Sequence, residues 1–552
     1  MTNNSFDVTN LPPYKKGNSF RYYLLILSSS LLRLTNYNRI SQPHITMAPS
    51  LPFDHVTIAV FGASGDLAKK MTYPAIYSLV ANGMLDVNKL HVVGTARSSY
   101  KGSEFQDKIK KGLKEKKDAK ASISDFLARC SYVSLKGYED TESYSELDAA
   151  ICKLEPEGKK SLRLFYIALP PSAFEDVSGN IKKKCWPQGK TNRLIVEKPY
   201  GKDEASAKRL SKHLESLFTE DEIYRIDHYL GKDTVKTILP LRFGGNPHLS
   251  STWSREHVSA VTINFKEEFG AEGRGGYFDE FGMIRDVMQN HLMQWIVLLG
   301  MEPPKSLSAD DIHEAKLKFI SECKPIVPED VLVAQYEASK SDKEKKAYKD
   351  DETVKDDSKA ATFATAVLYV DNERWRGVPF VIRAGKALDE TRAEVTLHFK
   401  TPAKALFPTA TPSTFTVRDH PEKSHTLTLS TKQVGEGFSI VSAPLVVDFD
   451  HASPDASVKA SYVPSAYETL IFEAITGDHT WFIPRAEAEA GWRVWDKAIS
   501  GTENRTPFAY EYGGQGPKEE KEFLKQRAHD VHFETGEAVT EDFRKQFGAL
   551  KL

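Results

Sequence analysis

Apolar runs alternate with predicted helices in the first part of the chain. Residues 56–61 form an apolar run that predicts a β-strand, a glycine-containing turn follows at 62–68, and a helical pattern continues to about Val80. Further strands are predicted at 90–94, 164–169 and 193–196. Strands that alternate with helices form parallel sheets through right-handed crossovers. Residues 54–226 are therefore predicted to form a doubly wound, Rossmann-type α/β domain.

After about residue 250 the apolar pattern changes to a period of two. Val261, Ile263 and Phe265 alternate with polar residues, and residues 394–399 and 427–429 do the same, which is typical of strands with one polar face. Residues 280–300 instead carry one apolar helical stripe. Residues 227–552 are therefore predicted to form an α+β domain with a mainly antiparallel sheet packed by helices. The charged segment 339–359 is predicted to be a mobile surface loop in that domain.

The first residues differ from the rest in composition. Residues 1–46 contain five lysines and arginines against one acid, as a targeting segment would, but the apolar run at 22–27 is too short to cross a bilayer, which takes about 20 apolar residues. Met47 precedes the first strand. We expect residues 1–53 to be a disordered extension, or one that is not made, with targeting as the alternative.

Composition and charge narrow the class of protein. The chain has 552 residues, of which 40% are apolar and 27% charged, as in ordinary globular proteins. Its 74 basic and 76 acidic residues give a formal charge of 74 − 76 = −2, so no strong field favours binding to nucleic acid or to a membrane. Four dispersed cysteines form no C-x-x-C pair, which argues against a zinc cluster and favours a reduced, cytoplasmic location.

The turn at 62–68, GASGDLA, has the chemistry of a phosphate-binding loop. Its small residues let the backbone approach a pyrophosphate, and a helix N-terminus follows. A plain tight turn of another α/β fold is the alternative. The second strand ends without the acid that would bind the ribose of NAD, and Arg97 stands there instead. Unless Arg97 is only a surface residue, its planar, charged side chain favours the 2′-phosphate of NADP.

Three further segments make the pattern specific: EKPYG at 197–201, RIDHYLGK at 225–232 and RDVMQNH at 285–291. Together with GASGDLA they resemble the signatures of the glucose-6-phosphate dehydrogenase family almost letter for letter. The resemblance covers nearly everything after residue 54 and is weak at 400–465. It implies NADP-dependent oxidation of D-glucose 6-phosphate to 6-phospho-D-glucono-1,5-lactone, the first step of the oxidative pentose phosphate pathway, by a homodimer or homotetramer.

The resemblance also implies roles for individual residues and no metal. Asp227 and His291 match the catalytic pair, in which a neutral imidazole takes the proton of the C1 hydroxyl while the carboxylate holds its tautomer. The matching substrate ligands are Lys198, His228, Tyr229, Lys232, Glu267, Asp286 and Lys386. The cofactor ligands are Gly62, Ala63, Ser64, Gly65, Asp66, Leu67, Arg97 and Lys198.

Two of these residues conflict with a simple helical pattern. His291 falls within the apolar stripe, between Val287 and Trp295, where a core histidine is the alternative interpretation. Asp286 and His291 are about 140° apart on an ideal α-helix at roughly 100° per residue, so both would not face one sugar. Either the helix begins irregularly or the substrate reaches across its end.

The chain also departs from the family pattern. Met71 replaces a lysine, Thr391 replaces a basic residue, Thr396 replaces an arginine associated with a second NADP in animal relatives, and His420 stands where a glutamine is usual. A second NADP site is therefore not expected. The alternatives to the expected enzyme are a paralogue acting on another hexose phosphate and a non-catalytic, NADP-binding subunit.

Overall fold

The computed structural model describes residues 51–528, apart from residues 102, 403, 405, 408–409, 436 and 449–461. The predicted N-terminal extension lies outside this range except for residues 51–53. Phe53 is 5% exposed and belongs to the apolar core of the first sheet, so the last residues of that segment are part of the fold.

The first sheet has six parallel strands in the order β3-β2-β1-β4-β5-β6. In this order β2 and β3 are added on one side of β1, and β4, β5 and β6 on the other side. It is the order of a doubly wound dinucleotide-binding sheet, and it confirms the predicted α/β class. The strands β3 and β6 were not predicted. The bounds are β1 His55–Phe61, β2 Leu90–Ala96, β3 Cys130–Ser134, β4 Ser161–Ile167, β5 Thr191–Glu197 and β6 Ile223–Ile226.

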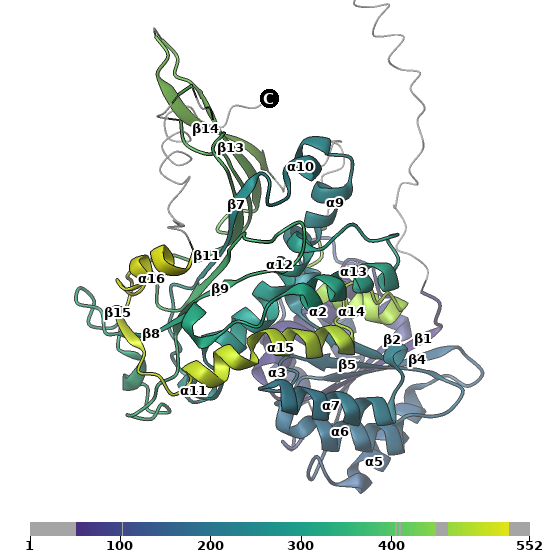
Figure 1. Ribbon diagram of the computed structural model, residues 1–552. Coiled ribbons are helices and arrows are strands. Elements are labelled where there is room, and N and C mark those ends of the chain that lie inside the picture. Colours follow the sequence, from purple (N-terminus) through teal and green to yellow (C-terminus); the bar gives the residue numbers. More distant parts are fainter. Residues whose placement is uncertain are drawn as a thin grey trace, which may run out of the picture. The chain divides into compact units, whose positions relative to one another are not determined.

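Helices cover both faces of this sheet. On one face α5, α6 and α7 bury their apolar side chains against the strands, and these helices lie together below the sheet in Figure 1. On the other face α2, α3 and α4 are joined by α14, which comes from the last part of the chain. The bounds are α2 Tyr73–Ala81, α3 Glu104–Lys110, α4 Ile123–Leu127, α5 Thr141–Leu154, α6 Phe174–Asn180, α7 Glu204–Leu217 and α14 Ala466–Thr476.

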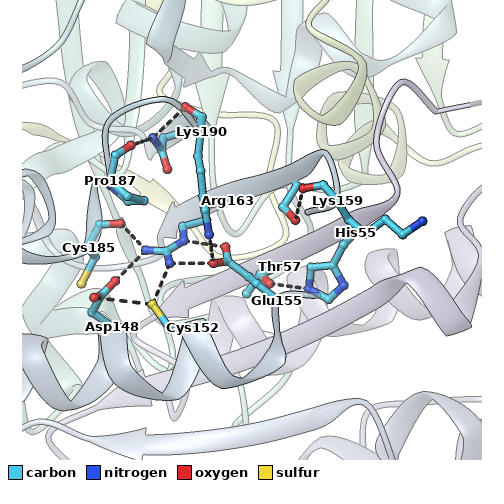
Figure 2. Close-up of polar contacts among 12 residues, drawn as sticks. His55, Thr57, Asp148, Cys152, Glu155, Lys159, Arg163, Cys185, Pro187 and Lys190 are labelled. Atoms are coloured by element: carbon cyan, nitrogen blue, oxygen red, sulfur yellow. Dashed lines mark hydrogen bonds and ion pairs between the residues drawn. The ribbon is translucent and has the colours of Figure 1, made fainter. Parts of the chain in front are cut away.

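A closed network of charges lies toward the amino ends of these strands (Figure 2). Arg163 of β4 is only 1% exposed, and its guanidinium donates to Glu155 at 2.6 Å, to Asp148 at 2.6 Å and to the Cys185 carbonyl at 2.9 Å. Lys190 also pairs with Glu155. Burial would raise the pKa of the Glu155 carboxyl, but Arg163 and Lys190 outweigh burial and lower it.

The second sheet has nine strands in the order β14-β13-β12-β11-β7-β10-β9-β8-β15. Two of its strand pairs are parallel, β7 with β10 and β8 with β15, and the others are antiparallel, so the prediction of a mainly antiparallel sheet is confirmed. The bounds are β7 Val258–Lys266, β8 Val331–Glu337, β9 Phe363–Leu368, β10 Phe380–Gly385, β11 Arg392–Phe399, β12 Thr414–His420, β13 Ser424–Lys432, β14 Ile440–Asp448 and β15 Phe508–Glu511.

The predicted polar face of this sheet is not exposed at its centre. Thr262 and Asn264 of β7 are each 4% exposed, and the hydroxyls of Thr396 and Thr416 bond to each other at 2.9 Å across β11 and β12. The polar residues at the centre of these strands are therefore buried, so the period of two did not identify a solvent face.

Helices pack on the second sheet as predicted, and none of the described helices is long and apolar enough to cross a membrane. The predicted helix over 280–300 is interrupted: Gly282 has a φ of 63°, and Ile284–Leu292 forms a π-helix between α11 and α12. The bounds are α8 Asp233–Lys236, α9 Ile238–Phe243, α10 Pro247–Thr252, α11 Gly275–Met283, α12 Met293–Gly300, α13 Ala309–Glu322, α15 Arg485–Thr502 and α16 Glu520–Arg527.

The charged segment 339–359 connects β8 to β9. Although most of its side chains are exposed, Tyr348 is fully buried and its hydroxyl donates to Asp279 at 3.2 Å. This tyrosine fixes the segment to α11, which leads into the π-helix.

Candidate active site

Most of the predicted site residues follow the carboxyl ends of strands. The glycine turn follows β1, Lys198 follows β5, and Asp227 and His228 follow β6. Ligands of doubly wound proteins bind at this edge of the sheet. Glu267 and Lys386 follow β7 and β10, which are parallel neighbours in the second sheet, so their side chains also meet.

Asp227 and His291 form a buried pair. Nδ1 of His291 lies 2.5 Å from Oδ1 of Asp227, and the two residues are 4% and 0% exposed. Burial would raise the pKa of the Asp227 carboxyl, but His291, with smaller contributions from His228 and the Tyr229 amide, lowers it. Because an ionised carboxylate only accepts hydrogen bonds, Nδ1 carries the proton of this bond, and in a neutral imidazole the lone pair is then on Nε2.

The π-helix resolves the conflict between Asp286 and His291. Its hydrogen bonds join residues five apart, so Asp286 and His291, five positions apart, lie on one face. Nζ of Lys198 donates to a carboxylate oxygen of Asp286 at 2.9 Å. Burial would raise the pKa of Asp286, but Lys198, Lys386 and His291 bring it down to about 2.

The predicted phosphate ligands lie beside this pair. The ring of His228 is 4.3 Å from that of His291 between centroids, and the Tyr229 ring stacks on His291 at 4.7 Å. Nζ of Lys232 lies 4.1 Å from the centroid of the Tyr229 ring. Burial, followed by His291, lowers the pKa of His228 well below its ordinary value, so this imidazole is neutral at pH 7.

The glycine turn packs closely against the ends of β2 and β4. Gly62 has a φ of 78°, and a Cβ there would lie 2.2 Å from the carbonyl oxygen of Ala168, so no larger residue fits. The backbone N–H groups of Gly62 and Ala63 donate to the Thr95 carbonyl of β2. Gly65 closes the turn on Gly62 at 2.8 Å.

Arg97 reaches the same edge from the end of β2. The adjacent Ser98 hydroxyl donates to the Ser64 hydroxyl at 3.1 Å, which ties the end of β2 to the turn. Arg97 is exposed, and its guanidinium carbon lies 4.9 Å from the centroid of the Tyr138 ring. Asp66 is exposed and pairs with Lys70, while Leu67 is half-buried. A dinucleotide with a phosphate near Arg97 fits these groups.

Three groups close to the site were not predicted. Asp419 of β12 accepts from Lys232, Tyr467 of α14 stacks on His228 at 5.7 Å between centroids, and Glu197 is buried directly before Lys198. Asp419 and Tyr467 lie in or next to the weakly matching segment. Glu197 is the first residue of the EKPYG motif, and an acidic residue directly after an apolar strand was the available signal.

The four residues that depart from the family pattern differ in their exposure and in their contacts. Met71 is 41% exposed, and the backbone N–H of Thr391 donates to Glu268. Thr396 bonds to Thr416 within the sheet, and His420 is half-exposed beside Asp419.

Ligand atoms of Asp227, His228 and His291 lie within 4.8 Å of one another, a grouping that could hold a metal ion. Asp227 and His291 already bond to each other in it, so a cation would have to displace that hydrogen bond. The arrangement therefore suits proton transfer better than metal binding.

Comparisons with known proteins agree with the motifs. Residues 59–237 match the family model described as glucose-6-phosphate dehydrogenase, NAD binding domain, and residues 239–532 match that of the C-terminal domain. The chain is 41% identical over 468 residues to glucose-6-phosphate 1-dehydrogenase of Emericella nidulans, covering 84% of this chain and 90% of the relative. It is 41% identical over 485 residues to that of Saccharomyces cerevisiae, covering 86% and 94%.

A solved structure of glucose-6-phosphate dehydrogenase in complex with its substrate glucose-6-phosphate superposes with a TM-score of 0.80 at 39% identity, covering 87% of this chain and 99% of that one. The sequence matches and the fold lead to one conclusion. The chain belongs to the glucose-6-phosphate dehydrogenase family.

Proposed function

We propose that this protein performs the family's reaction, oxidation of D-glucose 6-phosphate to 6-phospho-D-glucono-1,5-lactone, with Asp227 and His291 as its catalytic pair and NADP as its hydride acceptor. The observation that carries the assignment of the pair is the 2.5 Å contact between His291 Nδ1 and Asp227 Oδ1 beside the phosphate and sugar ligands. It leaves one imidazole nitrogen free to accept a proton.

His291 takes the proton of the C1 hydroxyl on Nε2, and Asp227 stabilises the imidazolium that forms. The low exposure of the pair strengthens this stabilisation, because a charge interaction grows as the local dielectric falls. NADP, when bound, supplies the nicotinamide ring that accepts the hydride released from C1. Loss of the hydroxyl proton and of the hydride together leave the C1 carbonyl of the lactone.

The other predicted residues hold the substrate. His228, Tyr229 and Lys232 bind the phosphate through imidazole, hydroxyl and ammonium groups. Four residues hold the sugar hydroxyls. They form two ion pairs, Lys198 with Asp286 and Lys386 with Glu267. Each pair offers a donor and an acceptor, as a hydroxyl requires.

The cofactor is held by the glycine turn and Arg97. The turn residues Gly62 to Leu67 would hold the pyrophosphate with those backbone N–H groups that do not already donate to the carbonyls of Thr95 and Gly62. Lys198 would approach the nicotinamide side, and Arg97 would bind the 2′-phosphate. Residues 54–226 thus serve as the cofactor-binding half and residues 227–552 as the substrate-binding and oligomerisation half.

Purified protein, NADP or NAD, and a panel of hexose phosphates test this function by NADPH or NADH absorbance. Glucose 6-phosphate with NADP should give the highest kcat/KM. Preference for another hexose phosphate would support the paralogue, and NADP binding without turnover of any sugar would support a non-catalytic subunit.

A homodimer or homotetramer in the cytoplasm completes the proposal. Its support is an apolar surface on the hairpin β13–β14, where Leu445 is 58% and Val447 54% exposed, which a second copy would cover. The four cysteines are free thiols, which supports a reducing compartment. Light scattering that found only monomers at micromolar concentration would contradict the oligomer.

A further inference from the structure

The predicted phosphate site contains a carboxylate. Oδ2 of Asp419 accepts from Nζ of Lys232 at 2.6 Å, and Oδ1 accepts from the Thr234 hydroxyl at 2.6 Å. The side chain of Asp419 is 3% exposed and that of Lys232 is 19% exposed. Asp419 is therefore held on both oxygens, behind the lysine that faces the site.

A β-bulge places this carboxylate. The pairing of β11 with β12 shifts register between Ala393 and Glu394, which pair with His420 and Arg418, so Asp419 between them has no partner residue on β11. Bulges redirect the side chain of the extra residue. Here the redirected side chain meets Lys232 and Thr234, at the start of α8.

The charges of the site cancel because of Asp419. Lys232 carries one positive charge and Asp419 one negative charge. His228 is neutral at pH 7 because its pKa is lowered, and burial raises the pKa of the Tyr229 hydroxyl, which keeps it neutral as well. A phosphate that binds here meets no net positive charge from these four residues, although it meets several hydrogen-bond donors.

Turning Asp419 away from Lys232 would disturb its hydrogen bond to Thr234 as well. Thr234 fixes its second oxygen, and its side chain is enclosed by protein. Lys232 must therefore share its three donor hydrogens between Asp419 and the substrate phosphate.

We propose that Asp419 is a specificity-determining residue that weakens the capture of phosphate by occupying and neutralising Lys232. This inference rests on the proposed role of Lys232 as a phosphate ligand. Its consequence is that phosphate alone binds poorly, so inorganic phosphate and other phosphate esters compete weakly unless the sugar contacts of Lys198, Asp286, Glu267 and Lys386 are also made.

The test is Asp419→Asn, which keeps the shape and a hydrogen-bond acceptor but removes the charge. Because a carboxylate no longer repels the phosphate, KM for glucose 6-phosphate and the inhibition constant of inorganic phosphate should both fall, by about fivefold or more. KM for NADP should stay unchanged. Assays are run at pH 8.

A structural role for Asp419 predicts the opposite result. If Asp419 only positioned Lys232, KM for glucose 6-phosphate and the phosphate inhibition constant would rise in Asp419→Asn, and the inference would be overturned. If Asp419→Asn does not fold, Asp419→Ser takes its place. It removes the charge with a smaller side chain, and it should lower both constants.

Glu473→Gln is the matched control. Glu473 pairs with Lys236, four residues after Lys232, at 3.0 Å, and both side chains are 16% exposed. We expect this variant to leave both constants unchanged. A fall equal to that of Asp419→Asn would show a general charge effect and would overturn the specific role of Asp419.

Lys232→Met separates this inference from the proposed function. If it leaves KM for glucose 6-phosphate unchanged, the phosphate assignment of Lys232 itself is wrong. If it raises KM while the neutral variants of Asp419 do not lower it, only the inference about Asp419 fails.

Discussion

The two ends of the parallel sheet both bury charged groups, but they use them differently. Toward the amino ends, Arg163 finds carboxylates, a carbonyl and a thiol, all from the protein, and the network is closed (Figure 2). At the carboxyl ends, Oδ2 of Asp227 has no hydrogen-bond partner in the described part of the chain, and the hydrogen bond between Asp227 and His291 uses only Nδ1 of the imidazole.

This difference separates stability from function. A buried charge is costly unless its bonds are made, so the closed network contributes to folding only while it is complete. At the carboxyl ends some buried polar atoms have no protein partner, and a bound substrate could form hydrogen bonds with them. Variants at the two ends should therefore affect different measurements.

The largest effect is expected at the carboxyl end. His291→Asn removes the proton acceptor and leaves His228 and Lys232 in place, so kcat should fall by about 10²–10⁴ while substrate and cofactor binding persist. Steady-state kinetics and calorimetric binding measure the two separately. Asp227→Asn should also be slow, and the double variant should be little worse than either single one.

A fully active His291→Asn protein would show that this histidine belongs to the apolar stripe of the helix. Unfolding in urea provides the control, since its midpoint should change little if the loss is chemical.

The next largest effect is expected at the amino end. Arg163→Met leaves Glu155 and Asp148 without their buried partner, which should lower the free energy of unfolding by about 3–5 kcal/mol. Urea titration measures it. KM for both substrates should stay unchanged, because the network lies at the opposite end of the sheet. Lys190→Met, which removes a partner that is 38% exposed, should cost less than about 1 kcal/mol.

Loss of activity at unchanged stability in Arg163→Met would abolish the distinction between the two ends. Equal stability losses in Arg163→Met and Lys190→Met would show that burial of the guanidinium is not what makes the network important.

A smaller effect is expected for the cofactor. Arg97→Ala should raise KM for NADP by the equivalent of about 1.5–3 kcal/mol, and it should leave NAD use nearly unchanged, because only NADP has the 2′-phosphate. Arg97→Lys keeps the charge without the planar guanidinium, so its KM for NADP should lie between those of the unsubstituted protein and Arg97→Ala. Equal losses with NADP and NAD would refute the assignment.

The secondary structure and the type of sheet were predicted well where the local pattern of apolar residues decides them. The apolar run before Gly62 and the alternation that follows predicted the parallel sheet. The short strand β3 was missed because only Cys130 among its five residues is fully buried. The docking of α14 on the first sheet was missed because it depends on contacts between segments hundreds of residues apart.

The candidate site was predicted mainly through motifs, and local periodicity failed at two places. Asp286 and His291 share a face because the helix is a π-helix, whereas the periodicity of the apolar stripe assumes 3.6 residues per turn. Asp419 reaches Lys232 because of a register shift, and an alternating pattern does not contain register shifts. Both irregularities lie at the candidate site.

The smallest effect sharpens the comparison between Glu197 and Asp227, which end neighbouring parallel strands. Asp227 has an imidazole partner and a lowered pKa, whereas burial raises the pKa of Glu197 to about 7, against opposing contributions from the Tyr166 hydroxyl and Lys198. Between its ordinary pKa of 4.5 and 7, Glu197 is protonated in the folded protein and ionised in the unfolded chain. The unfolded state then binds fewer protons, so stability falls as pH rises through this range and levels off above it.

Glu197→Gln stays neutral and keeps an acceptor for Tyr166. Between pH 6 and pH 8 the unfolding free energy of the unsubstituted protein should therefore fall by about 1–2 kcal/mol more than that of Glu197→Gln. Urea titration at both pH values measures the two changes. Identical pH dependence in the two proteins would show that Glu197 is ionised in the folded state, like Asp227.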